Sequence, residues 1–192
     1  ETVNFLKIMS FDSRVRVLRS EAKLSHSNAK NLGVSSSEGS YLCFLDHSIQ
    51  VFDAGWLAEM VSIAVREDVG CVGGRLLSSD RALKHADENV GLGGYAAHFH
   101  KVLATSFTEE LCWAGIRQQV CSVSGSCMLV KRSILAKVGE FDDAYDSDYT
   151  SLDMCLRINE LGYKNIYTPY AELISQEHES LTYIDEAGFI AR

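Results

Sequence analysis

The 192-residue sequence contains a single proline, Pro169, and no proline-rich or low-complexity segment. Basic residues are in the minority: 18 Lys and Arg against 26 Asp and Glu give a net charge of −8. A nucleic-acid-binding protein normally presents a basic face, so this balance argues against that class. No apolar run is long enough to span a membrane, and no stretch has the pattern of a signal peptide. These absences favour a globular domain with no transmembrane segment.

Cysteine is present six times, but there is no C-x-x-C pair and no Cys/His spacing typical of a zinc site. Most of the cysteines lie in apolar surroundings, such as Cys43 between Leu42 and Phe44. This pattern is typical of buried free thiols in a reducing compartment, and we therefore expect a cytoplasmic protein.

Short apolar runs alternate with longer amphipathic runs, which predicts an α/β layer architecture. The clearest strand is Tyr41–Leu45, whose continuous apolar run predicts burial on both faces. Further strands are predicted at residues 15–18 and at 166–168, the latter ending before Pro169. The other predicted elements are helices at 2–9, 25–36, 56–64, 133–138 and 150–161, strands at 70–74, 120–123 and 127–130, a hairpin over 75–86, and a long loop over 88–117.

The strand at Tyr41–Leu45 is followed at once by Asp46, His47 and Ser48. Ligands in open α/β sheets bind outside the carboxyl ends of the strands. A carboxylate at such a point can hold a divalent cation against a diphosphate group. An aspartate after a strand is also a common turn residue, so the motif alone leaves both interpretations open.

Several short motifs follow one another along the chain in a fixed order. They occupy residues 28–33, 38–46, 56–57, 72–76, 84–86, 122–132, 138–142, 152–157, 161–163 and 178–180. In order and spacing they resemble the family 2 glycosyltransferases, from about residue 14 to residue 180. Any one motif is a loose pattern, and their joint order is what makes the resemblance specific.

The resemblance implies an α/β fold of the GT-A type, a Rossmann-like mixed sheet flanked by helices. It implies one domain over residues 1–180 that lacks the family's first strands, followed by a tail at 181–192. The sheet should therefore have an exposed edge unless other polypeptide covers it. The chain begins at Glu1 rather than methionine, which predicts an excerpt or a processed product.

The resemblance also implies a function: transfer of a sugar, usually with inversion, from a nucleotide-diphosphate donor to a glycan or lipid-linked acceptor. Mn²⁺ or Mg²⁺ would assist as the divalent cation. The expected setting is polysaccharide biosynthesis in the cytoplasm or at the cytoplasmic face of the membrane, and a homo-oligomer is compatible with it.

Carried onto the matching positions, the resemblance implies a set of site residues. The donor contacts would be Lys30, Asn31, Asp46, Gly125 and Cys127, the metal ligands Asp46 and His178, and the catalytic carboxylate Asp153 or Asp148.

Two positions depart from the family pattern. Ser48 stands where the second acid of D-x-D is expected, and Thr150-Ser151 stand where E-D is expected. Asp153 is retained, but it could simply pair with Arg157 one helical turn away. These departures support an alternative: a degenerate domain without catalysis that serves as a sugar-binding or assembly module.

Overall fold

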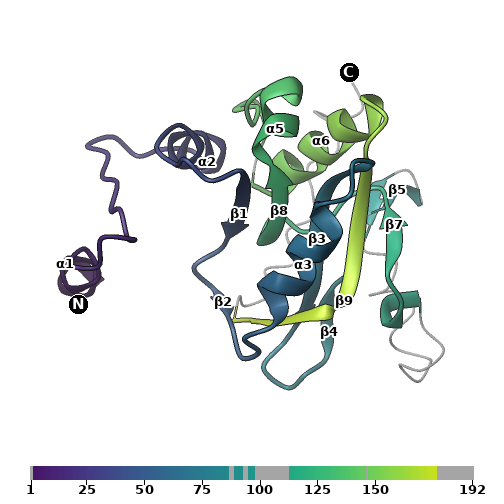
Figure 1. The fold of residues 1–192 in the computed structure, drawn as a ribbon, viewed down its shortest axis with the longest axis horizontal. Coiled ribbons are helices and arrows are strands. Elements are labelled where there is room, and N and C mark those ends of the chain that lie inside the picture. The colour runs from purple at the N-terminus through teal and green to yellow at the C-terminus, as the bar shows by residue number, and fades with distance from the viewer. Residues whose placement is uncertain (1, 87–88, 93–94, 98–112, 146, 177–192) are drawn as a thin grey trace.

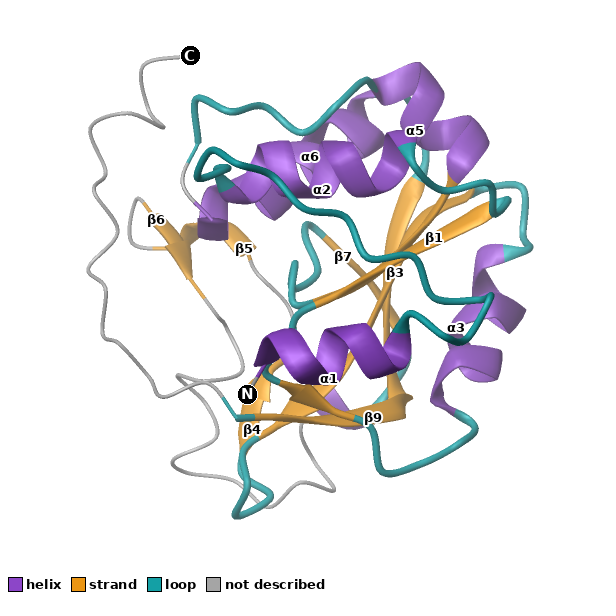
Figure 2. Cartoon of the chain, turned by 90° about the vertical axis from the view of Figure 1, so that its left-hand side faces the viewer, coloured by secondary structure: helices purple, strands orange, loops and turns teal. Residues whose placement is uncertain are grey.

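The computed structural model describes residues 2–86, 89–92, 95–97, 113–145 and 147–176. Their strands form one mixed seven-stranded sheet and a separate two-stranded hairpin, with helices packed on both faces of the larger sheet (Figures 1 and 2). The helices are α1 (Thr2–Met9), α2 (His26–Ser35), α3 (Trp56–Ala64), α5 (Arg132–Val138) and α6 (Ser147–Glu160), with a 3-10 turn at Trp113–Gly115. The strands are β1 (Tyr41–Leu45), β2 (Ile49–Gln50), β3 (Val69–Leu77), β4 (Leu83–His85), β5 (Asn89–Leu92), β6 (Tyr95–Ala97), β7 (Gln118–Val120), β8 (Cys127–Lys131) and β9 (Lys164–Ser175).

The main sheet runs in the order β1-β8-β3-β9-β2, with β4 paired to β3 and β7 paired to β9. The β3–β9 pair is parallel and the other pairs are antiparallel. The α/β class and the mixed sheet predicted from the sequence are therefore confirmed.

Two apolar clusters hold the helices on the sheet. Helix α3 covers one face through Met60 and Ile63, which pack with Val72 and Leu129 of the strands. Helices α5 and α6 cover the other face, where Ile158 lies in a second cluster. Full burial of each large side chain contributes about 1.5–3 kcal/mol, so these two faces account for much of the stability of the fold.

Glycines in β3 let its neighbours approach closely. A Cβ atom on Gly70 would lie 2.4 Å from the side chain of Ile158, and one on Gly73 would lie 2.4 Å from Val123. No real Cβ contact is that short, so glycine is needed at both positions for this packing.

Strand β1 lies at the edge of the sheet, because β8 is its one partner among the described strands. The prediction that β1 is buried on both faces was wrong. Leu42 is buried, but Cys43 and Leu45 are exposed. Helix α3 packs on β3, β8 and β9, which leaves this face of β1 open to solvent.

The N-terminal segment stands apart from the sheet, with α1 well separated from the other helices in Figure 1. Its apolar side chains are exposed, among them Phe5, Ile8 and Phe11. Residues 15–18, predicted as a strand, are irregular in the structure. A strand needs a neighbour for its backbone hydrogen bonds, and no described strand pairs with this one.

Three other predictions need correction. Strand β9 runs through Pro169 instead of ending before it, since its pairing with β3 jumps from Tyr167 opposite Gly73 to Glu172 opposite Arg75. The proline lies in this bulge, where the neighbouring strand does not need a hydrogen bond from its backbone N–H.

The helix predicted over 150–161 ends at Glu160, and Leu161 beyond it is 50% exposed. Within the long loop predicted over 88–117, β5 and β6 form a short hairpin and β7 begins at Gln118. The tail predicted at 181–192 lies outside the described residues.

Candidate functional site

A cavity of about 600 Å³ lies between α2 and β1 and reaches the turn that follows β1. Helix α2 contributes His26 and Lys30 to its lining, the turn contributes Asp46 and His47, and the loop before β8 contributes Gly125. Ligand pockets commonly enclose about 300–1,000 Å³, so the cavity is large enough for a nucleotide-sized molecule.

The turn after β1 is held by the aspartate that begins it. The Asp46 backbone N–H donates to the Ser126 carbonyl at 2.9 Å, which ties the turn to the loop before β8. The Ser48 N–H donates to the Asp46 carboxylate at 2.8 Å, and His47 Nδ1 lies 3.0 Å from the same oxygen. This carboxylate therefore shapes its own turn while it lines the cavity.

The Asp46 carboxyl is kept ionised by its surroundings. Burial on its own raises its pKa, but the hydrogen bond from Ser48 and the charges of His47 and His26 outweigh burial. The pKa of Asp46 is therefore lower than usual, and the cavity contains a carboxylate at neutral pH.

The described residues do not by themselves fit a divalent-cation site. The Ser48 hydroxyl is buried and faces the Asp46 carboxylate without forming a hydrogen bond of normal geometry to a described residue. A hydroxyl carries no charge, whereas Ca²⁺ and Mg²⁺ favour several oxygen ligands, carboxylates among them. No group of three or more His, Cys, Asp or Glu side chains in the described part of the chain is placed to hold a metal ion.

His178, the second predicted metal ligand, lies outside the described residues, and its role stays a prediction. The strand that leads towards it ends beside the turn, since the Gln176 N–H donates to the Ser48 carbonyl at 2.9 Å.

Lys30 extends from α2 to the loop before β8. Its Nζ lies 5.1 Å from the centre of the Phe141 ring, a cation–π contact that helps to hold the side chain. A Cβ atom on Gly125 would lie 3.2 Å from this Nζ and 2.8 Å from Ser151 Oγ. The missing side chain at Gly125 is therefore what lets Lys30 and Ser151 approach the loop.

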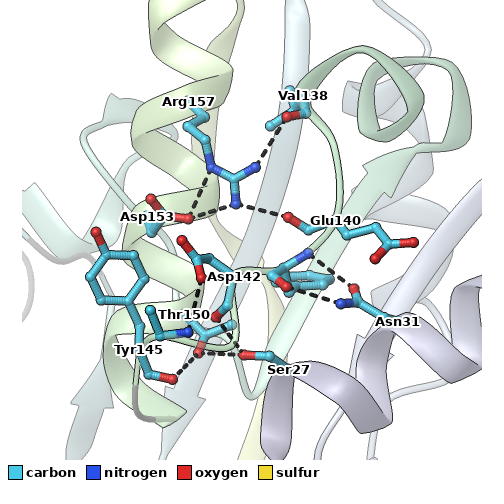
Figure 3. A network of polar contacts seen from close by, with 11 residues as sticks. Ser27, Asn31, Val138, Glu140, Asp142, Tyr145, Thr150, Asp153 and Arg157 are labelled. Carbon is cyan, nitrogen blue, oxygen red and sulfur yellow. Dashed lines mark hydrogen bonds and ion pairs between the residues drawn. The ribbon is translucent and has the colours of Figure 1, made fainter.

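Asn31 attaches α2 to a neighbouring loop, and its predicted contact with the donor stays a prediction. Its side-chain amide donates to the Phe141 carbonyl at 2.9 Å, and its carbonyl oxygen accepts from the Phe141 N–H at 3.0 Å (Figure 3). Both polar atoms of the amide are thus used to attach α2 to the loop between α5 and α6.

Hydroxyl groups replace acids at the start of α6 and are buried there. Thr150 Oγ1 lies 3.1 Å from Ser27 Oγ, which donates to the Asp142 carbonyl at 2.9 Å (Figure 3). Ser151 is 2% exposed. These side chains pack α6 against α2 and offer no carboxylate for proton transfer.

Asp153 is held by Arg157 in a two-point ion pair, with distances of 2.9 Å from Nε and 2.6 Å from Nη2 (Figure 3). The guanidinium also donates to the carbonyls of Val138 and Glu140 at 3.1 and 3.0 Å. The pair therefore anchors α6 to the end of α5. The alternative interpretation of Asp153 as a structural residue agrees with this geometry, and its catalytic role stays a prediction.

Cys127 is also turned away from the cavity. It is 1% exposed, and its sulfur lies 3.9 Å from the Met60 sulfur under α3. The predicted contact of Cys127 with the donor stays a prediction that its buried thiol does not support, whereas Gly125 does line the cavity. Asp148 belongs to α6, but its side chain lies outside the described residues.

His26 is a cavity residue that the sequence interpretation missed. It is the first residue of α2, directly after the N-cap Ser25, whose hydroxyl accepts from the Asn28 N–H. It lies four residues before Lys30, so both share one helix face. The four-residue spacing of His26 and Lys30 was the signal in the sequence that could have identified His26 as a cavity residue.

Comparison with known protein families identifies the family of this chain. Residues 2–139 match the family model for Glycosyl transferase family 2. The chain belongs to this family and is a glycosyltransferase domain.

Curated relatives of the chain are much longer proteins. An uncharacterized protein, y4gI of Sinorhizobium fredii (strain NBRC 101917 / NGR234), is 34% identical over 177 residues, covering 92% of this chain and 20% of that protein. The O-antigen biosynthesis protein RfbC of Myxococcus xanthus is 28% identical over 170 residues, covering 88% of this chain and 13% of RfbC. An N-acetylglucosaminyl-diphospho-decaprenol L-rhamnosyltransferase of Mycobacterium tuberculosis (strain ATCC 25618 / H37Rv) is 36% identical over 69 residues, covering 36% of this chain and 22% of that enzyme.

Solved structures show the same fold at low identity. A structure of GalNAc-T7 with UDP, GalNAc and Mn²⁺ superposes with a TM-score of 0.70 at 14% identity, covering 96% of this chain and 37% of that chain. The mannosyltransferase PcManGT from Pyrobaculum calidifontis, in complex with GDP-Man and Mn²⁺, superposes with a TM-score of 0.66 at 16% identity. The match covers 93% of this chain and 45% of that chain. These neighbours are GT-A glycosyltransferases, which confirms the predicted fold type. None of the helices in the described residues is long and apolar enough to cross a bilayer.

Proposed function

We propose that this domain transfers a sugar from a nucleoside-diphosphate donor to a hydroxyl group of a glycan or lipid-linked acceptor, with inversion. The observation that carries the proposal is the cavity beside β1, which ends at an ionised Asp46 and is lined by Lys30 and Gly125. It runs along β1 and reaches the carboxyl end of this strand, where open α/β sheets bind their ligands.

Residues around this cavity would bind the sugar donor. In this proposal Lys30 contacts the diphosphate, since an ammonium group offsets its negative charge. Asp46 faces the same cavity as an ionised acceptor of hydrogen bonds, suited to ribose or sugar hydroxyls. Gly125 lines the cavity beside Lys30 and is the other proposed donor contact. The divalent cation at Asp46 and His178 stays a prediction, and no part of this binding scheme depends on it.

The acceptor end needs a base, and we propose Asp148 for it. Asp153 is already paired with Arg157. Asp148 precedes Ser151 by three residues on α6, and positions three apart share a helix face. Ser151 packs against Gly125 at the cavity, which supports the choice of Asp148 as the nearest acid before it on α6. A carboxylate within hydrogen-bond reach of the acceptor hydroxyl could take its proton as the new glycosidic bond forms.

The setting proposed for this activity follows the relatives. One is described as an O-antigen biosynthesis protein and another transfers rhamnose to a lipid-linked acceptor. We therefore propose a role in polysaccharide assembly, at the cytoplasmic face of a membrane, where lipid-linked acceptors are exposed. A homo-oligomer is compatible with this role.

A second candidate is a domain that binds nucleotide sugars without transferring them. The specific observation in its favour is that Thr150 and Ser151 are buried at the start of α6, where a carboxylate would be required. In that case the cavity would serve binding or assembly within a longer protein.

Release of nucleoside diphosphate distinguishes the two candidates. The domain would be incubated with a panel of UDP-, GDP- and dTDP-sugars and a lipid-linked glycan fraction, and the released diphosphate would be measured with a coupled assay. We expect release that depends on the acceptor and falls about a hundredfold or more in Asp148→Asn, as general-base catalysis contributes about 10²–10⁴-fold. The control Asp80→Asn, in an exposed turn, should leave the rate unchanged. Donor binding without release in the wild type would support the second candidate instead.

A further inference from the structure

We propose that the cavity holds the donor diphosphate through the Lys30 ammonium group, without a divalent cation. This inference rests on the proposed function and adds to it the charge that compensates the donor. The structures of the fold neighbours contain Mn²⁺, whereas the residues of this cavity suit an anion better than a cation.

The cavity lining has too few carboxylates to bind a divalent cation. Asp46 is the one carboxylate among the residues that line it. One of its oxygens already accepts from the Ser48 N–H and lies 3.0 Å from His47 Nδ1. The neighbouring Ser48 provides only a neutral hydroxyl. A dipositive ion here would meet one shared carboxylate in place of the two that D-x-D supplies.

Basic side chains outnumber acidic ones in the cavity lining. Lys30, His26 and His47 all line it, so a lysine and two imidazoles face a single carboxylate. Lys30 and His26 are four residues apart on α2 and lie on one helix face. Protonated imidazole and ammonium groups both donate charge-assisted hydrogen bonds to phosphate.

Lys30 is also held in place beside the turn. Its ammonium lies over the Phe141 ring at 5.1 Å, and the absent side chain of Gly125 leaves it room. The next residue, Ser126, accepts a hydrogen bond from the Asp46 N–H at 2.9 Å. Direct contacts through the loop before β8 therefore connect the ammonium to the end of β1. A positioned cation loses little entropy on binding, which favours affinity.

Calorimetry with UDP, GDP and dTDP, each titrated in EDTA and again in MnCl₂, tests this inference. We expect at least one of them to bind with the same Kd, within about twofold, in both solutions. Lys30→Gln should weaken that binding about tenfold or more in both, because it removes a charge-assisted hydrogen bond. Lys30→Arg should restore most of the affinity. The matched control Lys7→Gln, at an exposed position of α1, should bind as the wild type does.

The outcomes separate this inference from the proposed function. Binding that requires manganese and is unaffected by Lys30→Gln would overturn the inference and retain the proposed function, with the cation at Asp46 and His178. Binding in EDTA that Lys30→Gln does not weaken would remove Lys30 from the site. No binding of any diphosphate in either solution would overturn both.

Thermal melting shows whether Lys30→Gln is folded. If it is not, the salt dependence of wild-type binding in EDTA serves instead. Affinity should fall between about 50 and 300 mM NaCl, since salt screens the attraction between the basic side chains of the cavity and the free diphosphate. An affinity that is independent of salt would count against a charged contact.

Discussion

The end of β1 and the start of α6 have each lost an acid relative to the family pattern, and the two regions differ in what surrounds the position. At the end of β1, the Ser48 hydroxyl is buried next to an ionised Asp46, and a cavity remains beside the turn. At the start of α6, Thr150 is hydrogen-bonded to Ser27 and packed between two helices. The first region retains space and charge for a ligand, whereas the second has become part of the helix packing.

The surviving carboxylates show the same contrast. Asp46 holds a turn through a backbone N–H and still faces the cavity. Asp153 makes two contacts with Arg157, which in turn bonds two carbonyl groups. Retention of an acid in a motif therefore does not by itself mean that the acid is available for chemistry.

The largest effect on stability is expected from Arg157→Leu. This change leaves Asp153 and two carbonyl groups without their donor in a partly buried place, which should cost about 2–3 kcal/mol, below the value for a fully buried pair. Urea denaturation would measure it, with Arg66→Leu as a control at a more exposed ion pair. Equal effects of the two changes would show that Asp153–Arg157 is not an anchor.

Gly125→Ala is expected to disturb both regions at once. The new Cβ atom would lie 2.8 Å from Ser151 and 3.2 Å from Lys30 Nζ, and overpacking of this kind costs about 1–3 kcal/mol. The matched control is Gly33→Ala on α2, where no atom lies within 4 Å. There the change should stabilise the helix by about 0.5–1 kcal/mol. If Gly125→Ala melts at the wild-type temperature, the loop is not closely packed.

Ser48→Asp sharpens the comparison by returning the missing acid to the end of β1. Two adjacent carboxylates repel each other, so the variant should lose about 1 kcal/mol of stability without metal. Manganese should restore that stability and bind measurably by calorimetry, because two carboxylates make a better site than one. A variant that manganese neither stabilises nor binds would mean that the turn cannot form a metal site even with both acids.

The smallest effect expected is the pH dependence due to Asp46. Its pKa in the folded chain is lowered, so the carboxylate stabilises the fold above the pKa of the unfolded chain, about 4. This contribution should be lost as the pH falls through the folded value. The difference in unfolding free energy between wild type and Asp46→Asn should therefore be present at pH 6 and shrink towards pH 3. A difference that stays constant over this range would exclude the ionised carboxylate as its source.

Much of the fold was predictable from local patterns. The helix at 56–64 coincides with α3, and the helix predicted from residue 25 is α2, with Ser25 as its N-cap. Gly139 ends α5 with a φ of 97°, a conformation that glycine adopts readily. Failures occurred where distant segments decide the outcome: residues 15–18 lack a neighbouring strand, and β9 passes Pro169 because a bulge opposite β3 accommodates it.

By itself, the sequence determined the α/β class, most helices and strands, the family, and the positions at which two motif acids are replaced. These features depend on periodicity, capping and residue type, which are local properties of the chain. Only the tertiary structure decided the use of each motif residue: Asn31 binds the Phe141 backbone, Cys127 packs under α3, Asp153 pairs with Arg157, and Lys30 reaches the cavity. The physical reason is that a polar side chain bonds to whatever packing brings within reach, and that partner lies far away in the sequence.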